Sequence, residues 1–199
     1  LRSDSNVILP SIQLNQGGDN SFLQGEAPTG LPVGNESYTI QAWIKANEIM
    51  ANGGILAWGQ KSKSQMNALR TLNDSLFNYH WSNDLQSQPA NYYDNQWHQI
   101  TATYDAETNN NSIYIDGAAI GTKKLSPLNM VETEIFVGRT LLGEYFQGSL
   151  SDVKIWNQAL TETEVAASFG NSAVKTEALI GSYLASQAEP LANTANKDQ

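Results

Sequence analysis

The chain has 199 residues, of which 40% are hydrophobic and 16% charged, as in an ordinary globular protein with one main domain. Its net charge of −9 argues against nucleic acid as a partner, because binding a polyanion requires clustered Lys and Arg. The lack of cysteine excludes disulfides, thiolate catalysis and Cys-ligated zinc, and no stretch approaches the ~20 apolar residues that insert across a membrane.

The first marked feature is the oxygen-rich loop 15–20, "NQGGDN". It offers the carboxylate of Asp19, the amides of Asn15 and Asn20, and the carbonyls of a Gly-Gly turn that begins at Gly17. Ca²⁺ binds about six to eight oxygens of these kinds. The loop is therefore a candidate calcium site, and the alternative is an ordinary turn, since the same residues favour turns.

Most of the sequence alternates with period two, which predicts strands that bury one face. The clearest segments are 38–46, 98–104, 111–117 and 148–156. In the first, Tyr38 and Ile40 begin one face, whereas Thr39 and Trp43 lie on the other. The breaks are rich in Gly, Asn, Asp and Ser, and they predict hairpins over 69–81, with the three-residue loop "NDS", and around "DAETNNN".

One short helix is predicted near the end, over residues 162–169. Thr161 and Glu164 form a capping box, Leu160 and Val165 have the spacing of a hydrophobic staple, and Gly170 can end the helix. One further strand is expected within 178–185, so that residues 1–185 form the domain and 186–199 a polar tail. The whole pattern predicts an all-β fold, an antiparallel sandwich of two sheets with one short C-terminal helix.

The stretch "YHWSNDL" (79–85) is a candidate sugar site, because rings stack on sugar faces while amides and carboxylates bind hydroxyls. Alternation puts Tyr79 and Trp81 on one face of a strand and His80 on the other. A forked bond between Arg70 and Asp84 is also possible. The predicted ligand-binding residues are Asn67, Arg70, Tyr79, Trp81, Asn83, Asp84 and Tyr145. The alternative is structural: Trp81 belongs to the core, and Asn83-Asp84 is a turn that caps the sheet.

Catalytic motifs are weak. Glu132 and Glu134 have the i, i+2 spacing of paired carboxylates, but they lack the central Asp and third Glu of the glucanase pattern. His98, after Trp97, is interpreted as a structural histidine. The sequence contains neither G-x-S-x-G nor H-E-x-x-H. We therefore expect a non-catalytic protein.

Four segments in order resemble the laminin-G-like jelly roll of the concanavalin A-like lectin/glucanase superfamily. They are "SYTIQAWIKA", "NQWHQITATYDAETNNNSIYIDGAAIG", "IFVGRT" and "FQGSLSDVKIWNQALTETEV". The resemblance covers roughly residues 7–170 and implies two antiparallel sheets of about six or seven strands each. It also places loop 15–20 beside the start of the strand "GSLSD", where Asp152 or the carbonyl of Gly148 would complete a structural calcium site.

The expectation for function is a non-catalytic, lectin-like carbohydrate-binding module that recognises a glycan or polysaccharide. Because the chain begins at Leu1 rather than Met, we expect it to be a processed product or one module of a larger secreted or surface protein, extracellular or at the cell surface. One alternative is a protein-adhesion or assembly module with a protein partner. A glycan hydrolase or lyase is the third possibility, since one fold hosts many functions.

Overall fold

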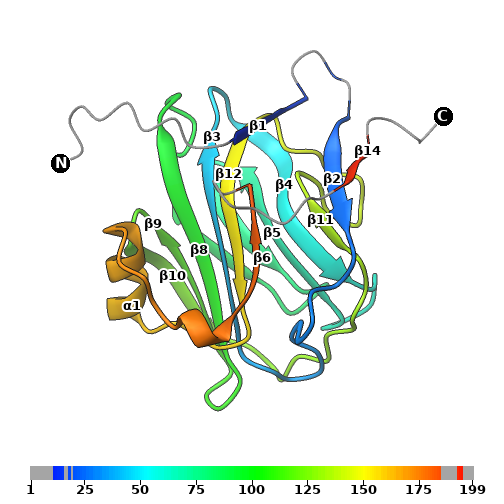
Figure 1. Cartoon of the computed structure of the whole chain (residues 1–199), viewed down its shortest axis with the longest axis vertical. Coiled ribbons are helices and arrows are strands. Elements are labelled where there is room, and N and C mark those ends of the chain that lie inside the picture. Colours follow the sequence, from blue (N-terminus) through cyan, green and yellow to red (C-terminus); the bar gives the residue numbers. More distant parts are fainter. Residues whose placement is uncertain (1–10, 16–17, 19, 185–191, 195–199) are drawn as a thin grey trace.

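The computed structural model describes residues 11–15, 18, 20–184 and 192–194. These residues form a sandwich of two antiparallel sheets with one short α-helix against one side (Figure 1). This is the predicted jelly-roll architecture, and the two sheets contain seven strands each in the described ranges. No helix in this part of the chain has the length and apolar character needed to cross a membrane.

Sheet A is built around β12, which pairs with β3 on one side and with β1 and β13 on the other. In spatial order its strands are β1 (Ser11–Leu14), β12 (Gly148–Trp156), β3 (Tyr38–Lys45), β8 (Trp97–Asp105), β9 (Asn110–Ile115) and β10 (Ala118–Lys124), with β13 (Leu179–Tyr183) beside β12. β1 and β13 meet the same edge of β12 end to end, because β1 pairs with 148–151 and β13 with 153–156.

Sheet B faces sheet A across the core. Its strands in spatial order are β14 (Ala192–Thr194), β2 (Phe22–Gly25), β11 (Ile135–Val137), β4 (Met50–Gly59), β5 (Met66–Asn73), β6 (Ser75–Tyr79) and β7 (Leu85–Pro89). The strand predicted within 178–185 is present as β13. Three residues of the predicted polar tail, 192–194, also form a strand and pair with β2.

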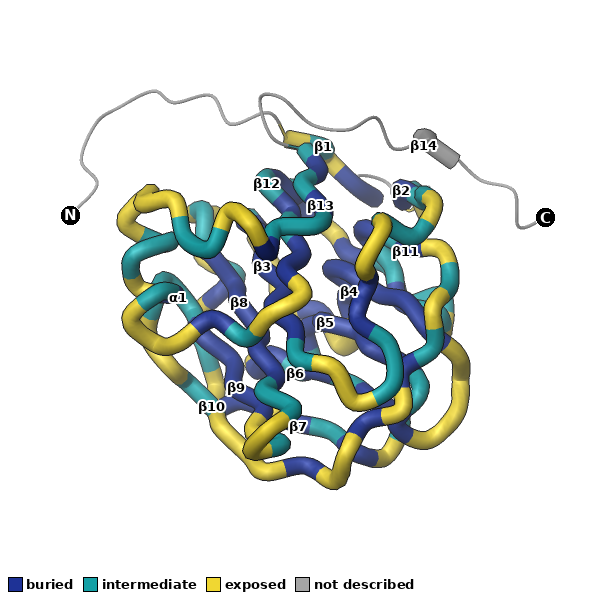
Figure 2. Tube along the Cα trace, turned by 60° about the horizontal axis from the view of Figure 1, so that its bottom comes forward, coloured by how far each residue is buried: buried dark blue, intermediate teal, exposed yellow. Residues whose placement is uncertain are grey.

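The core lies between the sheets, where the tube is mostly dark blue in Figure 2. Alternating residues of β3, among them Tyr38, Ile40 and Ile44, are fully buried there against Leu56 and Trp58 of β4. Two such faces exclude apolar side chains from water, which is the main stabilising contribution to a sandwich.

The other face of β3 is buried too, although alternation predicts a solvent-facing side. Helix α1 (Glu162–Phe169) covers it, and the ring of Trp43 stacks on Phe169 with centroids 5.9 Å apart. Gln41 accepts a hydrogen bond from Ser168 Oγ, and Thr39 accepts one from the amide of Leu160. The predicted capping box of Thr161 and Glu164 is confirmed, and it fixes where this helix begins. A short 3₁₀ helix, η1 (Thr176–Ala178), follows α1.

Both predicted hairpins are confirmed, with shorter loops than expected. In the first, Leu72 pairs with Ser75, so two residues rather than three form the turn. Asn73 there has a φ of 53°, a left-handed conformation that Asn tolerates. In the second hairpin Asp105 pairs with Asn110.

Candidate functional site

A row of four side chains crosses the outer face of sheet A. Trp97 of β8 lies directly opposite Lys45 of β3, Lys45 opposite Ser149 of β12, and Ser149 opposite Gln13 of β1. Directly opposed residues of antiparallel strands share a face with their Cβ atoms about 5 Å apart. The row therefore spans three strand spacings, about 14 Å.

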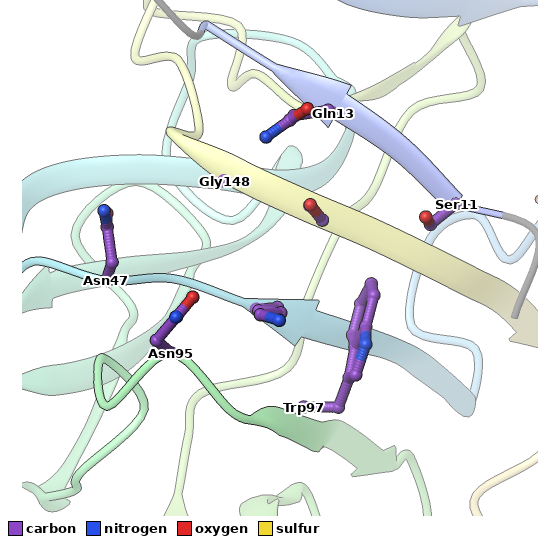
Figure 3. Close-up of a pocket in the computed structure, with 8 residues that line it drawn as sticks. Ser11, Gln13, Asn47, Asn95, Trp97 and Gly148 are labelled. Carbon is purple, nitrogen blue, oxygen red and sulfur yellow. The ribbon is translucent and has the colours of Figure 1, made fainter. Parts of the chain in front are cut away.

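This row forms the floor of a surface pocket with a volume of about 340 Å³. Figure 3 shows the indole of Trp97 at one end of the pocket and Asn47 and Asn95 together at the other. Gln13 and Ser11 lie on β1, along the opposite side from Trp97 and Asn95. The position of Asn95 is fixed by its backbone, whose amide donates to the carbonyl of Ala46 at 2.8 Å. The pocket thus combines one ring with several hydrogen-bonding side chains.

The pocket is open because α1 stops short of it. The next row of the same face contains Ser11, Ser151, Trp43 and Gln99. In that row Trp43 and Gln99 are buried, Trp43 beneath Phe169 of the helix. Trp97 and Lys45 are only partly buried, and no hydrogen bond, ring contact or ion pair joins either side chain to another described residue.

The predicted sugar cluster lies elsewhere, on the outer face of sheet B. Arg70, Tyr79 and Trp81 come together there, and Tyr79 and Trp81 share a face, as their alternation predicts. The guanidinium carbon of Arg70 lies 5.0 Å from the centroid of the Tyr79 ring, and the rings of Tyr79 and Trp81 are 6.0 Å apart. Trp81 is half-buried against the small apolar cluster that contains Met66. Ligand binding by these three residues stays a prediction.

The remaining members of the cluster have structural partners. Asn67 is fully buried between the sheets and its Oδ1 accepts from Asn78, which contradicts its predicted surface position. Asn83 is 9% exposed, and its amide donates to Ser64 Oγ and to the carbonyl of Ser126. Asn67 thus belongs to the interior of the sandwich, and Asn83 is buried in the turn after β6, where it bonds to the segments at 64 and 126.

The predicted fork between Arg70 and Asp84 is absent. Arg70 instead donates to Glu144 Oε1 at 2.7 Å and to Asn52. The Asp84 carboxylate accepts from the amides of His80, at 2.7 Å, and Ser82, at 3.2 Å. Asp84 therefore holds the turn after β6, which matches the structural alternative.

Tyr145 lies on the same sheet but in a different group of rings. Its centroid is 6.2 Å from that of Phe22, and the guanidinium carbon of Arg139 lies 5.7 Å from it. The neighbouring Glu144 connects this group to Arg70.

The two histidines have opposite electrostatic environments. Burial lowers the pKa of His80 to about 3, and its Nε2 lies 2.7 Å from the Tyr38 hydroxyl in a buried network with Asn78. His98 is held between two carboxylates, with Nδ1 2.8 Å from Asp116 and Nε2 3.1 Å from Asp94. The hydrogen bond to Asp116 raises the pKa of His98, against the opposing effect of burial. His98, at the start of β8, thus holds the segments of Asp94 and Asp116 against this strand, which agrees with its interpretation as a structural histidine.

Of the predicted calcium residues, the structure describes Gly148 and Asp152, which lie apart on β12. Gly17 and Asp19 lie outside the described residues. Gly148 pairs with Leu14 at the end of β1 next to loop 15–20, but Asp152 is four residues further along β12 and forms an ion pair with Lys154 at 2.7 Å. A strand rises by about 3.3 Å per residue, so Asp152 is some 13 Å along β12 from Gly148, and the two do not converge on one ion.

One observation near this loop is suited to a cation. The Oδ1 of Asn15 is buried without a hydrogen-bond partner, while its Nδ2 donates to the carbonyls of Phe146 and Ser21. Within the described ranges, no group of three or more His, Asp or Glu side chains could hold a metal ion. A calcium site here would therefore depend on amide and carbonyl oxygens together with Asp19.

A second cavity, of about 620 Å³, is lined by two carboxylates, Glu36 and Glu132. Glu36 accepts the amide of Val33 at 2.9 Å and so holds its own loop. Glu134, the other half of the predicted pair, accepts instead from Gln24.

Two residues of the open pocket could be picked out from the sequence, but not the fact that they lie side by side. Alternation places Lys45 on the face opposite the core, and Trp97 stands at the start of a predicted strand. Their proximity depends on the register between β3 and β8, which more than fifty residues separate in the chain.

The family model described as the concanavalin A-like lectin/glucanases superfamily, of the laminin G type, matches residues 16–166. This is most of the chain, which therefore belongs to that family. A search of the curated proteins gave no match.

Solved structures of the same fold come from several kinds of protein. A proposed carbohydrate-binding protein of Bacteroides ovatus has a TM-score of 0.64 and 21% identity, over 82% of this chain and 50% of that one, so the chain spans half the length of that protein. A heptameric pentraxin of Limulus polyphemus has a TM-score of 0.65 and 13% identity, over 94% and 91%. Domain 4 of an extracellular arabinanase of Geobacillus stearothermophilus, solved with arabinotriose, has a TM-score of 0.57 and 17% identity, over 73% and 70%. Identities this low establish the fold and not the ligand.

Proposed function

We propose that this chain is a non-catalytic, lectin-like module that binds glycans in the pocket on the outer face of sheet A. The observation that carries the proposal is the row of Gln13, Ser149, Lys45 and Trp97, which one uncovered sheet face presents side by side. We further propose that it works as one module of a larger extracellular or surface protein.

The pocket has the two kinds of groups that sugar recognition needs. The partly exposed ring of Trp97 offers an apolar platform for the C–H face of a pyranose. Asn47 and Asn95, both exposed, present amides that donate and accept at the same time, as sugar hydroxyls do. Strands hold the backbone of the row, so little backbone ordering opposes binding.

The carbohydrate ligands named for two proteins of the same fold support this proposal. The arabinanase domain was solved with an arabinose trisaccharide, and the Bacteroides ovatus protein is described by its expected carbohydrate binding. Docking of a protein partner has less support. Such docking normally uses a contiguous apolar patch, whereas Ile49 and Leu142 are the exposed large hydrophobic residues of the described part.

A glycan array tests the proposal and distinguishes the two surfaces. We expect the chain to bind at least one class of glycan, and Trp97→Ala to abolish that binding. The matched variant Tyr79→Ala removes a partly exposed ring from the outer face of sheet B and should leave binding unchanged. The reverse result would place the site in the Tyr79 cluster, and no binding to any glycan would refute the function.

A glycan hydrolase is the second candidate, because Glu36 and Glu132 line one cavity and glycosidases use two carboxylates. Release of reducing sugar from polysaccharides, lost in Glu132→Gln, would establish it. We expect no release, since Glu36 is engaged by the amide of Val33.

We also propose a structural Ca²⁺ at loop 15–20, held by the Asp19 carboxylate, Asn15 Oδ1 and a carbonyl at Gly17 or Gly148. The support is the chemistry of the loop and the unpartnered, buried Oδ1 of Asn15. Such an ion would tie the loop between β1 and β2 to the start of β12.

A further inference from the structure

We infer that the ligand of the sheet A pocket is an acidic glycan, in which an isolated uronic acid carboxylate binds Lys45 while a neighbouring sugar ring stacks on Trp97. This inference rests on the glycan-binding function proposed above and specifies its ligand class.

The charge of the pocket is the first observation. The chain contains 20 acidic and 11 basic residues, yet the described residues that line the pocket include one lysine and no carboxylate. Its other polar groups are hydroxyls and amides, which carry no charge. A carboxylate entering the pocket therefore meets a cation and no anion among the residues that line it.

The state of Lys45 is the second observation. Lys154 and Lys175 form ion pairs with Asp152 and Glu164, at 2.7 and 3.3 Å, and Lys123 donates to the carbonyl of Asp84 at 2.8 Å. Lys45 has no such partner among the described residues. Lys45 is partly buried and its ammonium group is unpaired among these residues, so the group is available for a ligand carboxylate.

The position of Lys45 in the row is the third observation. Its neighbours are Trp97 on one side and Ser149 on the other, at cross-strand separations of about 5 Å. A sugar stacked on Trp97 would thus place the substituents of the next sugar ring over the ammonium group. The span of about 14 Å suits an oligosaccharide rather than a single sugar.

The single cation of the row favours a ligand with widely spaced carboxylates over a densely sulfated one. The row provides one cation, whereas a chain of net charge −9 repels a heavily charged polyanion at longer range. Alternation of uronic acid with neutral sugars, as in hyaluronan oligosaccharides, matches one lysine beside one ring.

The test compares uronic acid oligosaccharides with their carboxyl-reduced counterparts, by isothermal titration calorimetry on the 199-residue chain. The panel contains oligosaccharides of hyaluronan and unsulfated chondroitin, in which uronic acid alternates with a neutral amino sugar, and heparin as the sulfated arm. We expect at least one native oligosaccharide to bind about tenfold more tightly than its reduced form, as for a charge-assisted hydrogen bond. Lys45→Gln should remove this preference, and Lys124→Gln, an exposed lysine of β10, should retain it.

The outcomes separate the two proposals. Equal affinity for native and reduced forms, with binding still lost in Trp97→Ala, would refute the acidic ligand and leave the glycan-binding function standing. Preference for heparin over every uronic acid oligosaccharide would refute the isolated carboxylate. If no member of the panel and no neutral glycan binds, both proposals fail.

Discussion

The rings of Trp43 and Phe169 stack with centroids 5.9 Å apart, and this contact marks where helix α1 stops covering sheet A. Two residues further along β3 the same face is open at Lys45, opposite Trp97. Two tryptophans on one sheet face thus have different environments, since Trp43 is 6% exposed and Trp97 is only partly buried.

This difference predicts opposite effects of removing the two rings. Trp43→Ala deletes a buried ring and should lower the free energy of unfolding by about 3–5 kcal/mol. Trp97→Ala should change it by less than about 1 kcal/mol while abolishing glycan binding. Urea unfolding and a binding assay on both variants check this. A large stability loss in Trp97→Ala would mean that the ring belongs to the fold.

Asp84 provides a second prediction. Its carboxylate accepts two amides across a turn in which Trp81 and Ser82 have positive φ, 60° and 70°. Asp84→Ala should therefore lower the free energy of unfolding by about 1–2 kcal/mol, and Asp84→Asn, which keeps one acceptor oxygen, by less. If Asp84→Ala instead weakens glycan binding at unchanged stability, the carboxylate is a ligand group, as the sequence first suggested.

The parts of the fold that the sequence predicts correctly are those with local causes. The helix at 162–169 depends on bonds between Thr161 and Glu164, three residues apart, and these are visible as a motif. The pocket instead depends on the registers of four strands between residues 13 and 149, which no local pattern contains.

β6 shows that alternation predicts which residues share a face of a strand but not which face is buried. Asn78 and His80, the residue directly after the strand, face the core, where they bond to Tyr38. Phe77 and Tyr79 instead point outward around Arg70. This reverses the usual rule of apolar side chains inside. Only the buried hydrogen-bond network, made by residues distant in sequence, accounts for it.

The two histidines predict how stability depends on pH. His80 is held neutral in the fold, with its pKa lowered to about 3, so the unfolded chain binds more protons between that value and about 6.5. Stability should therefore fall as the pH is lowered through this window, by up to about 1.4 kcal/mol per pH unit. His80→Gln should flatten this acidic limb in urea unfolding measured from pH 4 to 7. An unchanged slope would show that other groups cause the acid sensitivity.

His98 should have the opposite effect. Its pKa is raised, chiefly by the hydrogen bond to Asp116, so the folded state binds the extra proton. The stabilisation of the fold by protonated His98 is complete below about pH 6.5, and it is lost as the pH rises through the raised pKa. Its NMR titration should thus lie above that of a model histidine, and Asp116→Asn should bring it down. A midpoint at or below 6.5 would contradict the bonded pair.

The calcium proposal predicts a stability that depends on free metal. An ion that binds only the folded state adds about 2.7 kcal/mol at a hundredfold excess over its dissociation constant. Chelator should lower the melting temperature of the wild-type chain and leave Asp19→Ala unaffected, while Asp152→Ala should respond like wild type because Asp152 pairs with Lys154. A melting temperature indifferent to chelator would leave loop 15–20 as a turn.

The last prediction concerns the backbone of Trp81. A bulky residue at a φ of 60° is strained, and the ring compensates by packing beside Tyr79 and against the cluster of Met66. Trp81→Ala should lose about 1–3 kcal/mol of stability, less than a fully buried Trp, because the ring is half-exposed. Trp81→Gly loses the same contacts but accepts the positive φ without strain. It should thus be at least as stable as Trp81→Ala, although Gly usually costs about 0.5–1 kcal/mol relative to Ala. Urea unfolding of both variants measures this difference.

If Trp81→Gly is clearly less stable than Trp81→Ala, the left-handed turn is unstrained. If either variant loses glycan binding at wild-type stability, the Trp81 ring is a platform for the ligand.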